Sequence, residues 1–367
     1  MRVPVGNLKL LGLSGGDLAT TAPIVSAEKE VQPKPLRCLI LANAKAGSVR
    51  SLRTRLLLFG SRCWQKMLFK REPVDCDSQP ECVPMLARCA STCGIEAHVE
   101  VIPAPHQIPE RIRTAEHQGY DVVVAAGGDG TVHSIAQGMV HSNLRMGIIP
   151  MGTANNIARV LGLPLKMEDA MAVLASGEVH NIDVGRVAGT YFLEAAGVGL
   201  FADAFAAFGK DEPRKWQVFR LLKVLGPMLW NPPIRNLELK LDGVAEKDAA
   251  IWIAVSNSSY IGDNMPLAPE ASLEDGQFDV IIVGAMDRVE LLQFGIALAR
   301  GKHLSLPKVR GARAKIISIE RVHRGHRALP VHADAEIVGF TPTLLETLRG
   351  AIQMIVPQPE DAVPITP

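Results

Sequence analysis

The sequence predicts an α/β domain with an open, mostly parallel sheet, followed by a domain built as an antiparallel β-sandwich. The first part of this prediction rests on buried strands that alternate with helices up to about residue 180. The second part rests on a change after that point, where strand-like runs follow one another with turn residues between them. A chain of 367 residues is long enough for both domains.

The first domain, 36–180, is predicted from its hydrophobic pattern, and residues 1–35 before it are interpreted as a flexible extension rich in Gly, Thr, Pro and Ser. Because the run at 121–126 is almost entirely apolar, we expect a strand buried on both faces. The expected elements are, in order, a strand at 36–41, a strand at 95–101, a helix at 108–117, a strand at 121–126, a helix at 131–141 and a strand at 146–149.

The second domain, 181–341, is predicted from short strands, and Asp242-Gly243 is a hairpin signal between two of them. A helix is expected at 288–300. The expected strands lie at 182–187, 191–195, 237–241, 251–255, 278–283 and 316–319.

Composition excludes several classes of function. A formal net charge of +1 gives no overall basic field, so no nucleic-acid partner is expected. No apolar run reaches the length of about 18–20 residues that crosses a bilayer, and the N-terminus is too weakly apolar for a signal peptide, so we expect a cytoplasmic protein. The six cysteines form no Cys-x-x-Cys pair and are interpreted as reduced thiols. Nothing in the pattern indicates an oligomeric state.

The strongest local signal is the run Gly127-Gly128-Asp129-Gly130-Thr131, between a strand and a helix. Glycines let the backbone approach a phosphate closely, and the helix N-terminus behind them offers N–H groups and a positive dipole end. An acidic residue is unfavourable in an anion-binding loop unless it serves a metal or an ordered water, so Asp129 is informative. The alternative is an ordinary turn in which Thr131 caps the helix.

Two further loops follow strands in the same manner, 150–156 with Gly152, Thr153 and Asn155, and 43–48 with Asn43 and Gly47. Helix capping by Thr153 or Asn155 would explain one loop alone. Three such loops at the carboxyl ends of strands in one sheet should converge on one crevice. Neither a P-loop nor a Gly-x-Gly-x-x-Gly fingerprint is present, so any nucleotide is held in a different cradle.

Taken together, these three loops resemble the diacylglycerol kinase catalytic-domain family, which includes bacterial diacylglycerol kinases and sphingosine and ceramide kinases. The resemblance runs from about Leu36 to Pro357. It implies ATP and Mg²⁺ as cofactors, a lipid substrate at the membrane surface, and an active site between the two domains. It also implies that the last segment, 342–357, returns to the first domain.

The resemblance assigns nucleotide binding to the residues of the three loops and to one basic residue nearby. These are Asn43, Gly47, Gly127, Gly128, Asp129, Gly130, Thr131, Gly152, Thr153, Asn155 and Arg159. In the second domain it implies a structural Mg²⁺ held by Asp275, with carbonyl oxygens of Ser272 and Gln277. On the residues alone, Asp275-Gly276 reads as a plain β-turn.

The catalytic segment implied by the resemblance is His332-Ala333-Asp334-Ala335-Glu336. Asp334 would accept the proton of the attacking hydroxyl, and Asp129 would serve the metal and the phosphates. Glu336 is expected on the same side of an extended segment, where it would support Asp334. Asp183 is expected in the same polar network.

The chain departs from the family pattern at several positions of the expected site. Asn43 is followed by Ala44 where relatives usually have Pro, and His133-Ser134 stands where many have Asn-Glu. Asn156 replaces a frequent Asp, and Ala335 replaces the Gly between the two acids. These departures leave a non-catalytic lipid-binding relative open as an alternative.

Residues 213–232 combine basic and aromatic side chains with apolar ones, as in a helix that lies in a membrane interface. A helix that covers the core of its own domain would have the same pattern, and the sequence does not separate the two. A kinase of a soluble hydroxyl compound, similar to NAD kinases, remains the other alternative, because it would share the Asp129 loop. The sequence does not identify the lipid.

Overall fold

The computed structural model describes residues 35–43, 82–207, 226–227, 230, 232–262, 264–322, 327–334 and 336–363. Several sequence-based expectations therefore lie outside the described residues: the extension up to residue 34, Gly47, Ala335, and most of 213–232. Pro35–Pro367 form one compact unit. Among the helices described, none is long and apolar enough to span a membrane.

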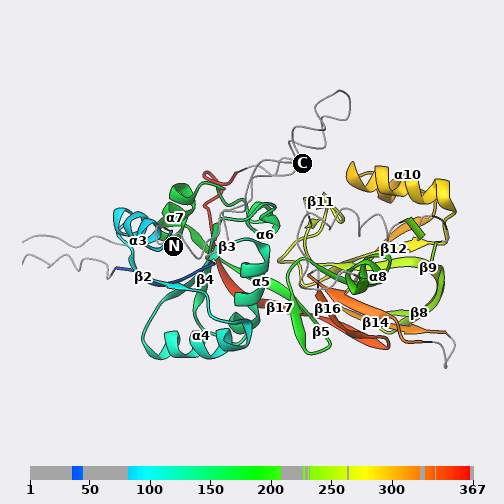
Figure 1. The fold of residues 1–367 in the computed structure, drawn as a ribbon, viewed down its shortest axis with the longest axis horizontal. Helices are drawn as coiled ribbons and strands as arrows, with labels where there is room; N and C mark the ends of the chain where they lie inside the picture. Colours follow the sequence, from blue (N-terminus) through cyan, green and yellow to red (C-terminus); the bar gives the residue numbers. More distant parts are fainter. Residues whose placement is uncertain are drawn as a thin grey trace, which may run out of the picture. The chain divides into compact units, whose positions relative to one another are not determined.

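The first part of this unit is a parallel sheet with helices on both faces, as predicted. The strands run in the order β17-β4-β3-β1-β2, and each neighbouring pair is parallel. Helix α3 packs with α7 and helix α4 with α5, on opposite faces of the sheet (Figure 1). The strands are β1 (Arg37–Ala42), β2 (Glu96–Val101), β3 (Val122–Gly127) and β4 (Arg145–Pro150); the helices are α3 (Cys82–Thr92), α4 (Ile108–His117), α5 (Asp129–Met139), α6 (Asn156–Val160) and α7 (Met167–Ser176).

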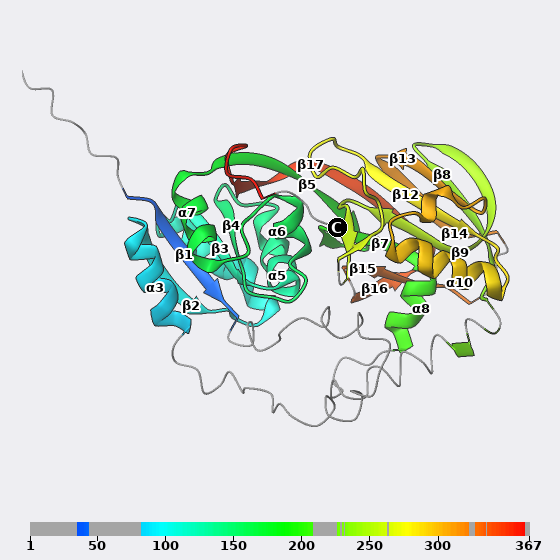
Figure 2. The same ribbon diagram turned by 90° about the horizontal axis from the view of Figure 1, so that it is seen from above.

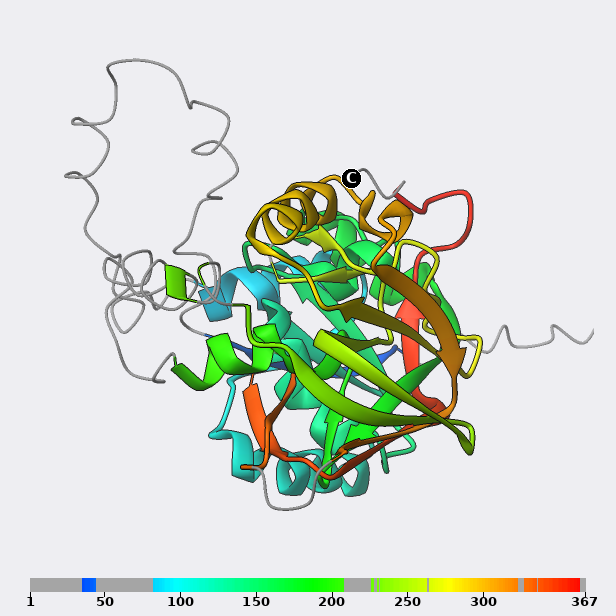
Figure 3. The same ribbon diagram turned by 90° about the vertical axis from the view of Figure 1, so that its right-hand side faces the viewer.

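The second part is an antiparallel sandwich, which confirms the predicted fold class. Its core includes Phe192, Ile253 and Phe278. Helix α10 (Arg288–Ala299) lies over an outer face of the sandwich (Figure 3), and its Phe294 belongs to a further cluster of buried side chains. The other elements are β5 (Glu178–Val187), β6 (Thr190–Phe192), β7 (Ala195–Gly199), α8 (Leu200–Ala207), β8 (Arg235–Leu241), β9 (Val244–Ser256), β10 (Tyr260–Ile261), β11 (Met265–Pro266), β12 (Phe278–Gly284), β13 (Val309–Ala314), β14 (Ile316–Arg321), β15 (Pro330–Ala333), β16 (Glu336–Phe340) and β17 (Thr343–Val356).

Strand β17 belongs to both parts of the sheet, and β5 runs beside it for most of its length (Figure 2). Its first residues pair with β14, and Met354 pairs in parallel with Met146 of β4. Between the two halves the register with β5 shifts, and Gly350 adopts a φ of +58° that a side chain would strain.

Three local expectations can be compared with the structure. The Asp242-Gly243 turn joins β8 to β9 with φ values of +47° and +88°, as a tight hairpin requires. The helix expected at 131–141 spans Asp129–Met139, because Gly128 is its extended N-cap and Thr131 lies inside the first turn. The expectation of an extended segment from Asp334 to Glu336 is wrong, because Asp334 has a φ of +41° and lies in the turn between β15 and β16.

Candidate active site

The loops after β3 and β4 touch through their glycines. A Cβ built on Gly152 would lie 2.5 Å from Cα of Gly128, and one built on Gly127 would lie 2.3 Å from Oγ1 of Thr131. Both distances are far below a normal contact, so neither position accepts a side chain without moving the backbone or its neighbour. The N–H of Met151 donates to the carbonyl of Gly127 at 2.8 Å and fixes the two loops together.

The loop after β1 joins them through Asn43. Its side-chain amide donates to Oγ1 of Thr131 at 3.0 Å, and its backbone N–H donates to the carbonyl of Ala126 at 2.9 Å. The expected convergence of three loops is therefore present as far as the described residues extend.

Asp129 connects the helix that it begins, α5, to the start of α6. Oδ2 accepts the backbone N–H of Asn155 at 2.9 Å, while Oδ1 is buried and has no hydrogen-bond partner among the described residues. Burial raises the pKa of this carboxyl, and the backbone N–H groups at the start of α6 oppose the rise. An orphaned buried carboxylate oxygen is a position at which a cation can bind.

Asn155 closes the second loop on itself in a left-handed conformation with a φ of +53°. Its side-chain oxygen accepts the N–H of Gly152 at 2.9 Å, and its amide donates to the carbonyl of Gly152 at 3.0 Å. Arg159 donates from Nε to the carbonyl of Ala154 at 2.9 Å. Asn155 and Arg159 thus hold the shape of the loop that contains Thr153, instead of reaching freely into solvent.

Asp334 is held by four hydrogen bonds. Oδ1 accepts the backbone N–H groups of Glu194 (2.8 Å) and Ala195 (3.1 Å), and Oδ2 accepts that of Leu193 at 2.8 Å. Nδ1 of His133 lies 2.9 Å from Oδ2 and carries the proton of this bond, since a carboxylate can only accept. The start of β7 therefore fixes the orientation of Asp334, and only one of its four bonds comes from a side chain.

His133 brings α5 of the first domain against Asp334 of the second. Burial acts to lower the pKa of this imidazole, but the hydrogen bond to Asp334 and the charges of Asp334 and Glu336 outweigh it and raise the pKa. The adjacent His332 lies on β15 in a fully buried position, and burial lowers its pKa to about 4 despite the charge of Asp334. Near neutral pH, His332 is therefore uncharged, whereas the partners of His133 stabilise its protonated form.

Glu194 is a third carboxylate at the site, and the sequence analysis missed it. Oε2 accepts from the amide of Asn156 at 3.1 Å, and the same amide donates to the carbonyl of Gly262 at 2.8 Å. Burial and the charges of Asp334 and Asp129 raise the pKa of Glu194 well above its ordinary value. Oδ1 of Asn156 is buried and has no hydrogen-bond partner among the described residues.

These groups line one cavity of about 250 Å³ between the α5–α6 region and the sandwich. Its lining includes three carboxylates, those of Asp129, Glu194 and Asp334, together with apolar side chains such as Phe201 and Met265. The full lining consists of Asp129, Gly130, His133, Ile157, Leu193, Glu194, Ala195, Phe201, Ile261, Gly262, Met265, His332 and Asp334. The arrangement suits a hydroxyl group attached to an apolar molecule, with acceptors for its proton close by.

Glu336 does not line this cavity. It is exposed at the start of β16, beyond the turn that positions Asp334, and it acts on the site through its charge on His133. The expectation that Glu336 supports Asp334 from the same side of an extended segment does not account for the turn between them.

The predicted structural Mg²⁺ residues lie in the turn before β12. Oδ1 of Asp275 accepts the N–H of Gln277 at 3.0 Å, and Oγ of Ser272 accepts that of Glu274 at 3.2 Å. Such bonds are those of a self-contained turn. In the part of the chain that the structure describes, no three His, Cys, Asp or Glu side chains are grouped as a metal site. The metal at Asp275 stays a prediction.

Asp183 belongs with this turn and not with Asp334, contrary to expectation. Its carboxylate accepts the N–H of Gly276 at 2.5 Å and that of Gly350 at 2.7 Å. Burial raises its pKa, the two backbone donors oppose the rise, and the charge of Asp275 adds to it. Asp183 therefore links the turn before β12 to the irregular point in β17.

Comparisons with known proteins agree with this arrangement. The model of the diacylglycerol kinase catalytic domain matches residues 79–187, and the model of the YegS C-terminal NAD kinase beta sandwich-like domain matches residues 227–356. A diacylglycerol kinase of Staphylococcus saprophyticus is 30% identical over 260 residues, which is 68% of this chain and 80% of the relative. One from Staphylococcus aureus is 29% identical over 254 residues, or 66% of this chain and 76% of the relative.

The crystal structure of a diacylglycerol kinase from Bacillus anthracis has the same fold, with a TM-score of 0.63 and 21% identity. The match covers 90% of this chain and 99% of the Bacillus anthracis chain. With both domains matched and a 30% identical relative covered over four-fifths of its length, the chain belongs to the diacylglycerol kinase catalytic-domain family.

Proposed function

We propose that this chain is an ATP-dependent lipid kinase that transfers the γ-phosphate of ATP to a lipid hydroxyl in the cavity between Asp129 and Asp334. The single observation that carries the proposal is this cavity, whose lining combines three carboxylates with apolar side chains. Diacylglycerol is the first acceptor to test, because the most similar relatives reported above are diacylglycerol kinases. The apolar lining residues favour a lipid over a soluble acceptor such as NAD.

In this proposal the loops of Gly128, Gly130 and Gly152 hold the phosphates. The first N–H groups of α5 have no acceptor within the helix and can donate to phosphate oxygens. Thr131 and Asn43 hold two loops together, and Asn155 and Arg159 hold the third. Thr153 and Gly47 complete the predicted nucleotide set.

Asp129 and Asn156 are the residues that would hold Mg²⁺ with the phosphates. Each has a buried side-chain oxygen with no partner among the described residues, and carboxylate and amide oxygens suit this hard cation. Bound there, Mg²⁺ would neutralise charge on the transferred phosphate.

Asp334 is the proposed proton acceptor. The acceptor oxygen attacks the γ-phosphorus, the bond to the bridging oxygen of ADP breaks, and the hydroxyl proton passes to Oδ2 of Asp334. The bond from His133 is the only one of the four that comes from a side chain, so it can yield to the substrate hydroxyl, while the three backbone donors keep the carboxylate in place.

The test is transfer of radiolabelled γ-phosphate from ATP with Mg²⁺ into detergent-dispersed diacylglycerol and other lipid alcohols, with NAD as the soluble acceptor. We expect a labelled lipid with the parent chain and a loss of at least about 100-fold with Asp334→Asn, the usual scale for a positioned base. Label in NAD alone would replace the lipid by a soluble acceptor. ATP binding without any transfer would support a non-catalytic lipid-binding protein, and full turnover by Asp334→Asn would remove its proposed role.

A further inference from the structure

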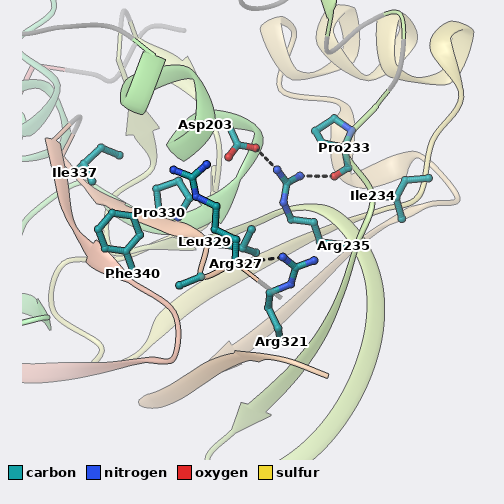
Figure 4. A pocket seen from close by; sticks show the side chains of 11 residues that line it. Asp203, Pro233, Ile234, Arg235, Arg321, Arg327, Leu329, Pro330, Ile337 and Phe340 are labelled. Carbon is teal, nitrogen blue, oxygen red and sulfur yellow. Dashed lines mark hydrogen bonds and ion pairs between the residues drawn. The ribbon is translucent and has the colours of Figure 1, made fainter. Parts of the chain in front are cut away.

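A second and larger cavity, of about 610 Å³, lies on the sandwich outside the candidate active site (Figure 4). Three of its lining side chains are arginines, Arg235, Arg321 and Arg327, and one is acidic, Asp203. The other lining residues are apolar: Pro233, Ile234, Ala328, Leu329, Pro330, Ile337 and Phe340. With three arginines and one aspartate, the lining has a formal charge of +2 among apolar side chains.

In this arginine pocket, one arginine has a carboxylate partner among the described residues and the other two do not. Nη2 of Arg235 donates to Oδ2 of Asp203 at 2.8 Å, and both side chains are largely buried. Arg321 donates to the carbonyl of Arg327 at 2.9 Å, which leaves its positive charge without a carboxylate partner among the described residues. Arg327 is exposed and also lacks such a partner there. Two guanidinium groups therefore remain for an anionic ligand.

The apolar part of the pocket reaches the surface. Phe340 is 61% exposed and Ile234 is 51% exposed, although both are large hydrophobic side chains. A ligand that is only an anion would leave these side chains in water. A ligand with an anionic group attached to acyl chains would satisfy the arginines and cover the apolar rim together.

The arginine pocket shares two elements with the candidate active site. On α8, Phe201 lines the active-site cavity and Asp203 lines the arginine pocket. The β15–β16 hairpin carries Asp334 at its turn, and Ile337 and Phe340 of the same hairpin line the arginine pocket. A membrane lipid bound in this pocket would therefore bring the bilayer next to the elements that carry the acceptor site.

We infer that the arginine pocket binds the phosphate headgroup of an anionic phospholipid in the membrane, at a site separate from that of the phosphorylated lipid. Arg321 and Arg327 contact the phosphate, and Phe340 and Ile234 lie against the first part of the acyl chains. This inference goes beyond the proposed reaction and does not depend on it, because binding can be measured without ATP.

The test is co-sedimentation of the full chain with vesicles of phosphatidylcholine alone or mixed with phosphatidylglycerol. We expect binding to the mixed vesicles, and a loss of about 30-fold in the Arg321→Gln/Arg327→Gln variant, since one basic side chain near an anionic membrane contributes about a factor of five. The matched control is Arg300→Gln/Lys302→Gln, which removes the same charge from exposed positions outside the pocket. It should stay within about threefold of the parent chain.

The exposed position of Arg327 offers a second variant, Arg327→Glu, which avoids any disturbance of the β14 end and should lose more than about fivefold. Circular dichroism and thermal melting check that each variant is folded. Equal losses in both double variants would mean that only net charge matters, and the inference would be wrong. Release of the chain from vesicles by millimolar glycerol phosphate would also overturn it, in favour of a soluble phosphate as the occupant.

Discussion

Gly130→Ala separates a phosphate-binding loop from an ordinary strand-to-helix turn. Gly130 lies in the first turn of α5 and is exposed. Apart from its chain neighbours and the backbone of its own helix, no atom of the described residues lies within 4 Å of the position that a Cβ would take. Alanine should therefore fit the protein without strain. Because alanine is the better helix former, we expect the free energy of unfolding to stay the same or to rise by up to about 1 kcal/mol.

The same substitution should weaken the binding of ATP. The added methyl group points back toward the N-terminal end of the helix, where the phosphates are proposed to bind. Loss of one charge-assisted hydrogen bond from this N–H costs about 1.5–3 kcal/mol, which weakens ATP binding about 10- to 100-fold. Calorimetric titration with ATP and urea unfolding measure the two effects separately.

Gly295→Ala is the matched control, since Gly295 is also a helical glycine with open space around its Cβ, but on α10. It should gain stability in the same manner and bind ATP as the parent chain does. If Gly130→Ala bound ATP within twofold of the parent chain, the loop would be a turn without a phosphate, and the nucleotide would have to bind elsewhere.

Three further substitutions test the packing and charges of the site. Gly152→Ala should destabilise the fold by about 1–3 kcal/mol in urea unfolding, because its Cβ meets the backbone of Gly128; unchanged stability would refute the close contact. His133→Gln should lower the stability of the fold below about pH 6.5, where the ion pair with Asp334 is fully formed, and this loss should fade as the pH rises through the raised pKa of His133. A loss of stability that is constant from pH 5.5 to 9 would contradict a stabilising positive charge on His133. Glu194→Gln should reverse the order of stability of the two chains between pH 4.5 and pH 7. The parent chain loses stability as the pH rises above about 4.3 and through the raised pKa of Glu194, by about 1.4 kcal/mol per unit of pKa shift, so the variant should be the more stable chain near pH 7. Unfolding curves at pH 4.5 and 7 that leave the two chains in the same order would argue against the crowding of carboxylates around Glu194.

The convergence of the three loops after β1, β3 and β4 could be predicted because each loop is local in the sequence. Each of its loops follows a buried strand, and parallel strands place their carboxyl ends at one edge, so Asn43, Thr131 and Gly152 had to come together. The hairpin at Asp242-Gly243 was predictable for the same reason, since two residues define it.

The other side of the site could not be read from the sequence. His133 and Asp334 are 201 positions apart, and no spacing rule brings them to 2.9 Å. Glu194 lies between apolar residues of β6 and β7 and has no motif around it, so only the packing of the sandwich against α6 gives it Asn156 as a partner. The turn at Asp334 was missed because a positive φ at a residue other than glycine is uncommon.

Strand β17 has a consequence for how this protein unfolds. Because the strand is central to the sheet in both halves of the described unit, neither half keeps all its backbone hydrogen bonds when the other is lost. Denaturation should therefore be a single cooperative event for both halves. Either half expressed alone should expose an unpaired strand edge and aggregate through it. The same continuity leaves the irregular point at Gly350, fastened by Asp183, as the place where the two halves can bend without breaking their common strand.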